Sequence, residues 1–500
     1  MSVTGIAFLI AFAAGCVLAL GRHPIYGLVT YIGVFYLDPY SRWWGEPLPN
    51  LRWSLLAAVV TLAAVQIHRT KVLTHGKLFG HSVIKWLLVL VAWMLIQLSW
   101  AINFDEHLDL LTYYAKFLVI IYLIYRVIDS EEKLLIFLRA HVAGCFVLGW
   151  TAYTQYEGGR FEDFGGAGGG DANSFALQLV TGIFAASALF LAGKKWDKLA
   201  VFLSVPFIVN GVVTTVSRSA FLAVSTGGLI YNCFTPKPYR RRVGLLSLLA
   251  IALFLILTNP IYWARMDSLK SAGEDVEGVD TGSGRLVVIE KQWDMFKANP
   301  LGHGHRGTAY LSPAYLADHH LTGPAGNRGR SSHNTFMTML VEHGLIGAAV
   351  YVAIVLWMIR SLRALWRRVR GTDGFFAVLV PTVAAILGCV TIGDMFVDYV
   401  KLEVRLWFIA ILMVMVDLSR KGTVETLSSG DKPSLGSRRP RRGPTKVALK
   451  AQALNHKSQI GIRGRNGHSN PGDCTLAFDI TKYPPDDCRI DMTRVRARLD

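Results

Sequence analysis

Charged residues are scarce in this sequence of 500 residues. Asp, Glu, Lys and Arg make up 17% of the chain, while hydrophobic residues make up 52%. Soluble domains carry about 25% charged residues, so the composition excludes an ordinary water-soluble protein. The hydrophobic residues form continuous runs of about 17–25 residues, the length that crosses a bilayer core. The sequence therefore predicts an all-α, polytopic transmembrane helical bundle, and the absence of apolar–polar alternation excludes a β-barrel.

Cysteine is also rare, and the chain has no C-x-x-C pair. The six cysteines are scattered over apolar segments and the C-terminal region, at Cys16, Cys145, Cys233, Cys389, Cys474 and Cys488. This spacing supports neither a zinc ribbon nor a disulfide framework. No Lys or Arg precedes Arg22, so the basic start of a secretory signal is missing and we expect the first helix to be retained.

Thirteen apolar segments follow one another along the chain. They cover residues 3–20, 24–38, 51–67, 82–100, 110–127, 134–153, 174–193, 198–216, 219–235, 243–258, 334–359, 375–394 and 400–418. The second is short and contains two glycines, so it could instead form a re-entrant hairpin with the first. The prediction is therefore about 12–13 spanning helices.

Basic residues concentrate in loops that join alternate segments. These loops lie at residues 68–77, 193–195, 237–242 and 360–370. Since cytoplasmic loops are rich in Lys and Arg, we assign all of them to the cytoplasmic face, which puts the N-terminus outside if all 13 segments span. The predicted domains are N-terminal transmembrane helices (1–258), one large periplasmic loop (259–333), C-terminal transmembrane helices (334–418) and a tail (419–500).

The tail has no helical or strand period and contains the run Arg438-Arg439-Pro440-Arg441-Arg442. We expect it to be a disordered, basic cytoplasmic tail that can contact anionic membrane lipids. The net charge of +17 could suggest a nucleic-acid partner. No aromatic interleaving or folded module accompanies the charge, so no nucleic-acid partner is expected.

An arginine stands between two apolar segments in the run Ser217-Arg218-Ser219. Arg at such a position is costly unless it is paired or functional. Its planar guanidinium suits bidentate binding of a phosphate. The alternative, an Arg whose side chain reaches the membrane interface from a helix end, is equally consistent with the position.

A second arginine follows glycines in the run Gly282-Ser283-Gly284-Arg285. A helix that starts there would present free N–H groups to an anion. The pattern is weak alone, and the alternative is an amphipathic helix packed through Val287, Trp293 and Phe296.

His333 and Asn334 open the eleventh apolar segment. A neutral His can accept a proton from a hydroxyl group near pH 7, although a structural His fits as well. Ser331 or Ser332 could cap the helix. Upstream, a Gly-rich run leads into Asp171, for which we favour an N-cap role, and Asn173, whose role is open.

Histidines crowd the loop before His333, and they raise the question of a metal. The candidates are His303, His305, Asp318, His319, His320 and His333 itself. No His-Glu-x-x-His or comparable spacing occurs, so neither a metal nor another cofactor is expected. A Ser hydrolase is disfavoured too, because there is no G-x-S-x-G motif.

Together these motifs resemble the O-antigen ligase and polymerase family. The resemblance is carried by Ser217-Arg218-Ser219, by Arg285…Trp293…Pro300-Leu-Gly302-His-Gly304, and by Ser332-His333-Asn334…Glu342-His-Gly344-Leu-Ile-Gly347. It covers residues 170–360, and the start of the chain is similar to the O-glycosylation ligases associated with exosortase systems. It implies a multi-pass glycosyltransferase of the bacterial inner membrane whose active site faces the periplasm.

The resemblance also implies residue roles. Arg218 and Arg285 correspond to arginines that hold a diphosphate, and His333 to a general base. Arg265, Asn173 and Asn334 are weaker candidates. The donor would be a glycan on undecaprenyl diphosphate, and the acceptor a hydroxyl group of a glycan, lipid or protein.

Such a reaction is chemically coherent without a metal, because two arginines can neutralise charge on the leaving diphosphate. Direct displacement predicts inversion at the anomeric carbon. A ligase and a polymerase would share this chemistry. A transporter or flippase of lipid-linked sugars is the alternative from another class, but the middles of most apolar segments lack polar residues and no internal repeat is visible.

Overall fold

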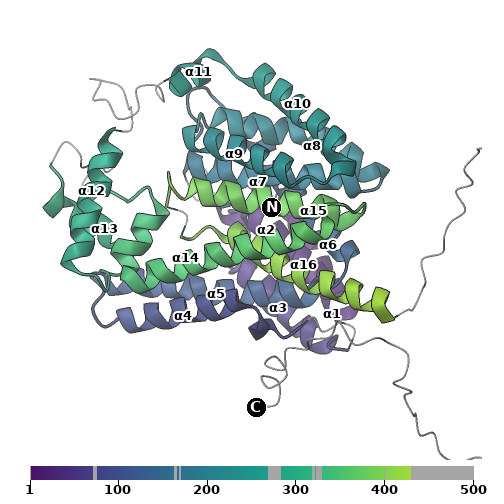
Figure 1. Cartoon of the computed structure of the whole chain (residues 1–500), viewed down its shortest axis with the longest axis horizontal. Helices are drawn as coiled ribbons and strands as arrows, with labels where there is room; N and C mark the ends of the chain where they lie inside the picture. The colour runs from purple at the N-terminus through teal and green to yellow at the C-terminus, as the bar shows by residue number, and fades with distance from the viewer. Residues whose placement is uncertain are drawn as a thin grey trace, which may run out of the picture. The chain divides into compact units, whose positions relative to one another are not determined.

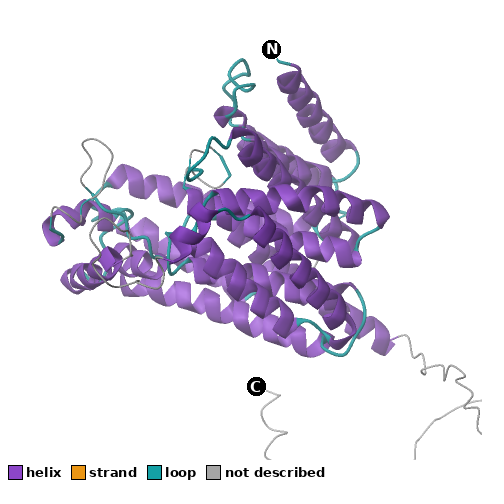
Figure 2. Ribbon diagram, turned by 90° about the horizontal axis from the view of Figure 1, so that it is seen from above, coloured by secondary structure: helices purple, strands orange, loops and turns teal. Residues whose placement is uncertain are grey.

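The computed structural model describes residues 2–428, apart from positions 71, 73–75, 163–165, 168–170, 268–282, 318–320, 322–328 and 399. All of these residues belong to the first of two units, Met1–Gly430, and the second unit is Asp431–Asp500. The described part is built from α-helices joined by loops and short 3₁₀ turns, with no β-strand in it (Figures 1 and 2). This confirms the predicted all-α class, while the predicted tail beyond residue 428 lies outside the described residues.

Each of the thirteen apolar segments forms a helix. They are α1 (Val3–Gly21), α2 (Ile25–Leu37), α3 (Trp53–Ile67), α4 (Ser82–Gln97), α5 (Phe104–Val127), α6 (Glu131–Gln155), α7 (Ala172–Ala192), α8 (Lys195–Thr214), α9 (Arg218–Phe234), α10 (Arg240–Leu257), α14 (Thr335–Val369), α15 (Phe375–Gly393) and α16 (Glu403–Ser428). The expected outer loop adds α11 (Pro260–Asp267), α12 (Ser283–Ala298) and α13 (Gly307–Tyr315).

Seven of the described helices are long and apolar enough to cross a membrane: α1, α5, α6, α7, α8, α14 and α15. An eighth span is possible if the last 3₁₀ turn before α10, α10 itself and α11 count as one bent segment, which turns through 105°. Helices α3 and α4 are apolar but shorter. Helix α2 has 13 residues, about 20 Å, which is less than the roughly 30 Å of a hydrocarbon core.

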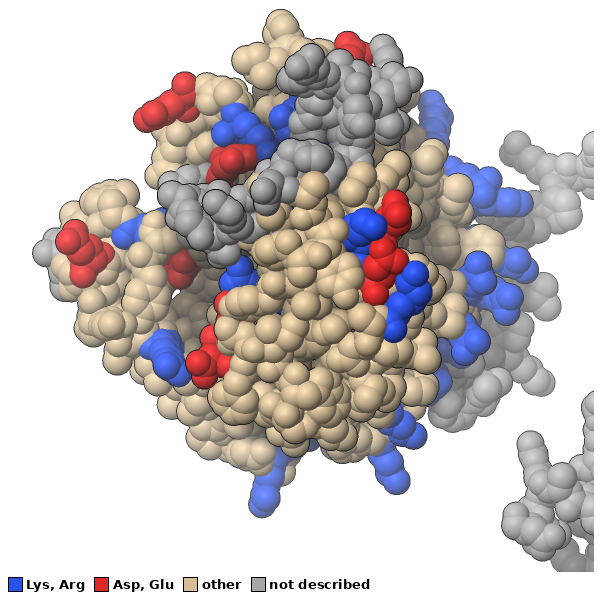
Figure 3. Space-filling view, turned by 90° about the vertical axis from the view of Figure 1, so that its left-hand side faces the viewer, with Lys and Arg blue, Asp and Glu red and all other residues tan. Residues whose placement is uncertain are grey.

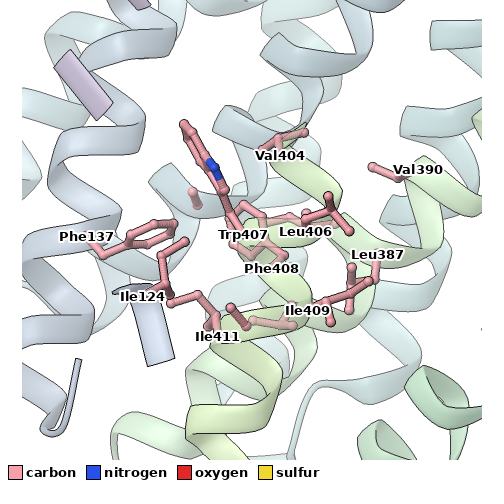
Figure 4. Packing of buried hydrophobic residues seen from close by; sticks show 14 of the residues in the cluster. Ile124, Phe137, Leu387, Val390, Val404, Leu406, Trp407, Phe408, Ile409 and Ile411 are labelled. Atoms are coloured by element: carbon pink, nitrogen blue, oxygen red, sulfur yellow. The ribbon is translucent and has the colours of Figure 1, made fainter. Parts of the chain in front are cut away.

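Helix α16 packs against α5, α14 and α15, and its Trp407 also contacts aromatic rings of α2 and α6. Residues 407–415 of this helix are fully buried. Trp407 packs edge-on against Phe35 and Phe137, and Figure 4 shows this cluster from close by. A helix that is apolar on every side must be enclosed by protein or lipid. Here protein encloses it.

The predicted basic loops gather at one end of the bundle, which we call the basic end. His81, before α4, lies 3.1 Å from Asp417 of α16. Tyr125, near the end of α5, donates a hydrogen bond to the same carboxylate at 2.6 Å. Arg368 of α14 donates to Ser419 at 2.8 Å. The loops around residues 68–77 and 360–370 are therefore on one side of the molecule, as the alternation of segments predicts.

The opposite end, which we call the site end, holds the first residues of α7, α9 and α14 and the last residues of α15. Helices α9 and α15 are antiparallel neighbours, because Cys389 donates to the carbonyl of Ala223 while Gly388 faces Ile230. Arg218 at the start of α9 therefore lies at the same end as Asp394, which follows α15. The N–H of Thr335 at the start of α14 donates to the Asp394 carbonyl at 2.7 Å.

Helix α14 is broken at Gly344, which has φ +67° and ψ −168°. Phe336 and Tyr351 lie on opposite sides of this break, yet their ring centroids are 5.2 Å apart. In a straight helix, 15 residues would separate them by about 22 Å. The segment before Gly344 therefore folds back on the segment that follows it.

The loop after α12 satisfies the backbone groups exposed by this break. His303 and Gly304 donate their N–H groups to the carbonyls of Val341 and Glu342 at 3.0 and 2.8 Å. Leu345 donates back to the Pro300 carbonyl at 2.9 Å. Side chains of α4 complete the set, since Trp93 donates to the carbonyl of His343 at 2.7 Å. The two glycine motifs of the sequence, Pro300–Gly304 and Glu342–Gly347, therefore contact each other through their backbones.

Replacing Gly344 by Ala should disrupt this contact. A Cβ at this position would lie 2.4 Å from the carbonyl carbon of Leu301, and φ +67° disfavours any L side chain. We expect a loss of roughly 2 kcal/mol or more in the free energy of unfolding, seen as a lower midpoint of thermal unfolding in detergent. Gly228→Ala is the control, because its Cβ would meet nothing within 4 Å. Equal midpoints for the two variants would contradict the proposed role of Gly344.

Candidate functional site

A small polar cluster joins the start of α7 to the start of α9. The Asn173 side-chain oxygen accepts hydrogen bonds from Ser217 at 2.7 Å and from Ser219 at 3.3 Å. Asp171 caps α7 by accepting from the N–H of Ser174 at 2.9 Å, as the sequence predicted. Asn173, whose role the sequence left open, therefore holds the two serines that flank Arg218.

Arg218 is the first residue of α9 and is half-buried. Ser217 caps the helix by accepting from the N–H of Ala220 at 3.2 Å. Val216 just before it has φ +47°, a conformation that is costly for a β-branched residue. Strained backbone of this kind persists where the surroundings enforce it and is concentrated at functional sites. The backbone of the turn before Arg218 is therefore held in one conformation by its surroundings.

Helix α11 lies over the same turn. Its Tyr262 and Met266 are buried against Val216 and the end of α8 in a separate apolar cluster. Arg265 lies between these two residues in the sequence and is half-buried. The fold therefore brings the element that carries Arg265 to the segment that carries Arg218.

Arg285 lies in the first turn of α12, and its side chain is outside the described residues. The packing suggested for this helix from the sequence holds in part, since Val287 and Phe296 are half-buried. The buried face consists of Val288, Gln292 and Met295, whereas 49% of Trp293 is exposed.

Helix α12 is tied to the start of α14 through its buried glutamine. Gln292 donates to the Ser332 hydroxyl at 2.7 Å, and this hydroxyl donates to the Asn334 carbonyl at 2.8 Å. The helix that carries Arg285 is thereby connected to the residues on both sides of His333.

His333 is exposed and has φ +51°. The next residue, Asn334, caps α14 by accepting from the N–H of Met337 at 3.1 Å, so the cap is neither Ser331 nor Ser332. Thr335 donates its hydroxyl to the Val397 carbonyl at 2.9 Å. The segment around His333 is held on both sides, and His333 itself is an exposed residue.

A buried ion pair lies beside the start of α14. Arg405 of α16 pairs with Asp394, which also accepts a hydrogen bond from Tyr351. Asp394 is 1% exposed and Arg405 is 8% exposed. Removing one partner of such a pair leaves an uncompensated buried charge, so the pair fixes the relative positions of α14, α15 and α16.

The structure reveals a second polar cluster that the sequence analysis missed. His305, considered there as a possible metal ligand in the outer loop, is buried, and its Nδ1 lies 3.0 Å from Oε2 of Glu342. The same oxygen accepts the N–H of Arg306 at 2.8 Å. Arg306 has φ +58° and pairs with Glu106 of α5 at 2.8 Å. The one available signal was the pairing of a His-Gly-His run with a Glu-His-Gly run in the sequence.

Two further histidines complete this cluster. His107 accepts the N–H of His305 at Nδ1, at 2.9 Å, and its Nε2 therefore carries the proton that is donated to the Met94 carbonyl at 2.8 Å. His343 Nδ1 lies 3.0 Å from the side-chain oxygen of Gln97, so Nδ1 carries its proton. The hydrogen bonds thus assign His107 as the neutral tautomer with its proton on Nε2, and they place a proton on Nδ1 of His343.

Burial sets the protonation of the groups outside the spanning helices. Burial, with Lys401 nearby, lowers the pKa of His305 to about 4, so the ring is neutral at pH 7. Burial raises the pKa of Asp398, in the loop between α15 and α16, to about 6. Figure 3 views the site end, where acidic and basic side chains surround a recess.

The candidate metal ligands divide into two groups. Asp318, His319 and His320 lie outside the described residues. His303 donates from Nε2 to the Met295 carbonyl at 3.0 Å, and His305 is bonded to Glu342. In the described ranges, no three His, Cys, Asp or Glu side chains are placed to hold a metal ion.

Acidification should destabilise the protein through His305. The unfolded His binds a proton near pH 6.5, but the folded one does so only near pH 4. The free energy of unfolding therefore falls as the pH decreases from 6.5, by about 2 kcal/mol at pH 5. We expect the thermal midpoint of the wild-type protein to drop more between pH 7 and pH 5 than that of His305→Gln. Parallel curves for the two proteins would contradict the assignment.

Comparison with known proteins supports the resemblance seen in the sequence. Residues 199–352 match the family model described as O-Antigen ligase. No curated protein matches the chain. The matched segment contains Arg218, Arg265, Arg285, His333 and Glu342 and begins within α8. The chain is therefore a multi-helix membrane protein that carries an O-antigen ligase family domain, which implies an enzyme of the glycosyltransferase and ligase type.

Proposed function

We propose that the protein transfers a glycan from undecaprenyl diphosphate to an acceptor hydroxyl group on the periplasmic side of a bacterial inner membrane. The observation that carries this proposal is the match of residues 199–352 to the O-antigen ligase family, together with the placement of Arg218 and His333 at one end of the bundle. Helix α9 begins at the end of the bundle where α15 ends, because the two helices are antiparallel. Helix α14 begins at the same end, because Thr335 donates a hydrogen bond to Asp394 after α15.

In this proposal Arg218 and Arg285 bind the diphosphate of the donor. Arg218 adds its charge to the partial positive charge at the start of α9, where backbone N–H groups favour an anion. Arg285 occupies the first turn of α12 in the same way. Two guanidinium groups can neutralise the charge that grows on the diphosphate as the glycosidic bond breaks, so the reaction needs no metal.

His333 acts as the general base. Its imidazole accepts the proton of the acceptor hydroxyl while the oxygen attacks the anomeric carbon. The bond from that carbon to the diphosphate oxygen breaks, undecaprenyl diphosphate leaves, and the configuration inverts. The exposed ring of His333, on a positive-φ residue fixed by the Asn334 cap, suits this role because an acceptor can reach it.

Asn173, Asn334 and Arg265 act as positioning residues. Asn173 holds Ser217 and Ser219 around Arg218, Asn334 fixes the backbone beside His333, and α11 brings Arg265 to the same turn. A polymerase would use the same residues with a second lipid-linked glycan as acceptor. Ligase and polymerase activities differ in the acceptor that the enzyme accepts.

The test is transfer by the purified protein in detergent from a defined undecaprenyl-diphosphate glycan to a panel of glycan, lipid and peptide acceptors. His333→Ala should lower kcat by about 10²–10⁴, the usual contribution of a general base. Arg218→Ala should also abolish transfer, and Arg218→Lys should restore only part of it, because Lys lacks the bidentate fork.

Lys195→Ala is the matched control, since Lys195 is exposed at the other end of α8. Its transfer rate should equal that of the wild-type protein. Wild-type rates for the Arg218 and His333 variants would remove these residues from the mechanism. Loss of the Gly344 contact is excluded as the cause if the variants keep the wild-type thermal midpoint.

A further inference from the structure

A cavity of about 450 Å³ lies among α2, α3 and α5, outside the segment that matches the family. This volume is in the range of small-molecule sites. Its walls are mainly apolar. They are formed by Leu55, Val59 and Leu62 of α3 and by Phe117 and Ile120 of α5, with Val34 of α2 behind them.

The polar lining residues are concentrated at the end of the cavity that lies toward the site end. Arg52 precedes the first residue of α3, and Tyr40 lies in the loop that follows α2. Lys116 is level with the start of α16, because the neighbouring Tyr114 donates to the Val400 carbonyl at 3.0 Å. From Arg52 to Leu62 the groove extends ten residues along α3, about 15 Å. It is polar at its mouth and apolar along its depth.

The mouth presents positive charge. Arg52 and Lys116 are exposed, and neither forms an ion pair with any described residue. Lys401 adds a third cation, since Lys116 and Lys401 lie 5.1 and 5.4 Å from the ring centroid of Tyr113.

Two carboxylates also line the cavity, but the protein already engages both of them. Glu403 accepts hydrogen bonds from Tyr31 at 2.6 Å and from Trp407 at 2.9 Å. Asp38 interacts electrostatically with Arg42. The cations at the mouth are therefore the charges left to bind a ligand.

We propose that this groove binds an anionic glycerophospholipid, with the head group between Arg52 and Lys116 and one acyl chain along α3 and α5. Apolar walls suit the chain, because each CH₂ group removed from water stabilises the complex. The cations suit the head group and distinguish an anionic lipid from a zwitterionic one.

This site is separate from the proposed donor site. Helices α3 and α5 pack with α1, α2, α4 and α16, whereas α9 packs with α7, α10 and α15. The two groups of helices lie on different flanks of the bundle, α3 and α5 below and α8, α9 and α10 above in Figure 1. Lipid binding here does not depend on the glycosyltransferase proposal and can be measured without any glycan.

Native mass spectrometry of the full chain in detergent, with phosphatidylglycerol or phosphatidylcholine of identical acyl chains, tests the proposal. The wild-type protein should retain phosphatidylglycerol preferentially. Arg52→Gln and Lys116→Gln should each weaken its retention about fivefold, equivalent to about 1 kcal/mol per cation. Arg241→Gln, an exposed cation at the start of α10, should leave it unchanged.

A second pair of variants tests the acyl-chain part of the groove. Ala58 lines the cavity and Leu56 does not. Ala58→Trp should fill the groove and displace the lipid, whereas Leu56→Trp on the exposed face of α3 should not. Thermal midpoints identify any variant that fails to fold.

Three results would overturn the proposal. One is equal retention of the two lipids by the wild-type protein. Another is an unchanged preference in Arg52→Gln and Lys116→Gln. The third is full competition by glycerol phosphate, because an ion without an acyl chain would then account for the binding.

Discussion

The backbone contact between the Pro300–Gly304 loop and the break in α14 is the constraint on which the outer part of this protein depends. A helix that breaks exposes carbonyl and N–H groups, and burying them without partners is costly. Here the loop supplies N–H groups to Val341 and Glu342 and takes one from Leu345. Only glycine has the φ angles that Gly302, Gly304 and Gly344 adopt without strain, which explains why the two motifs are rich in it.

This contact also places the candidate site. Because α14 folds back at Gly344, its first residue lies beside Tyr351 and Asp394 instead of at the tip of a long helix. His333 is therefore presented at the level where α9 begins. The buried pair of Arg405 and Asp394 holds the same three helices together, and the hydrogen bond from Tyr351 to the carboxylate offsets part of its desolvation cost. Strained backbone at Arg306 and His333 lies in the segments that this framework fixes.

The positions of the cations suit a substrate that is both charged and lipid-linked. An enzyme whose donor has a polyprenyl tail must accept a charged group and a lipid at once, so cations at helix starts beside the membrane are well suited to the task. Arg218 has this position at the start of α9 and Arg52 has it just before α3, whereas Lys116 lies within α5 at the mouth of the groove. The histidine cluster around His305 and Glu342 joins α5 and α14 to the loop before α13 through hydrogen bonds.

The sequence by itself determined the helices. All thirteen apolar segments form helices near the predicted residues, because continuous hydrophobic runs leave few alternatives and the backbone must satisfy its own hydrogen bonds in an apolar environment. It also determined the local cap at Asp171 and the family of the segment that contains Arg218 and His333, since both follow from residues close together in the chain or in a fixed order. The sequence also showed that the second apolar segment is short, and in the structure α2 has 13 residues, too few to cross a bilayer core by themselves.

Only the tertiary structure decided which distant residues meet. The burial of His305 against Glu342, the contact of Asn173 with Ser217, and the engagement of Glu403 by Tyr31 join residues between 37 and 372 positions apart. No periodicity in the sequence encodes such pairs. The fold-back of α14 likewise depends on a loop that must already be in place to satisfy the broken turn. Patterns of neighbouring residues determine where helices form. The residue that supplies a missing hydrogen bond or charge to another is determined by the packing of the whole chain.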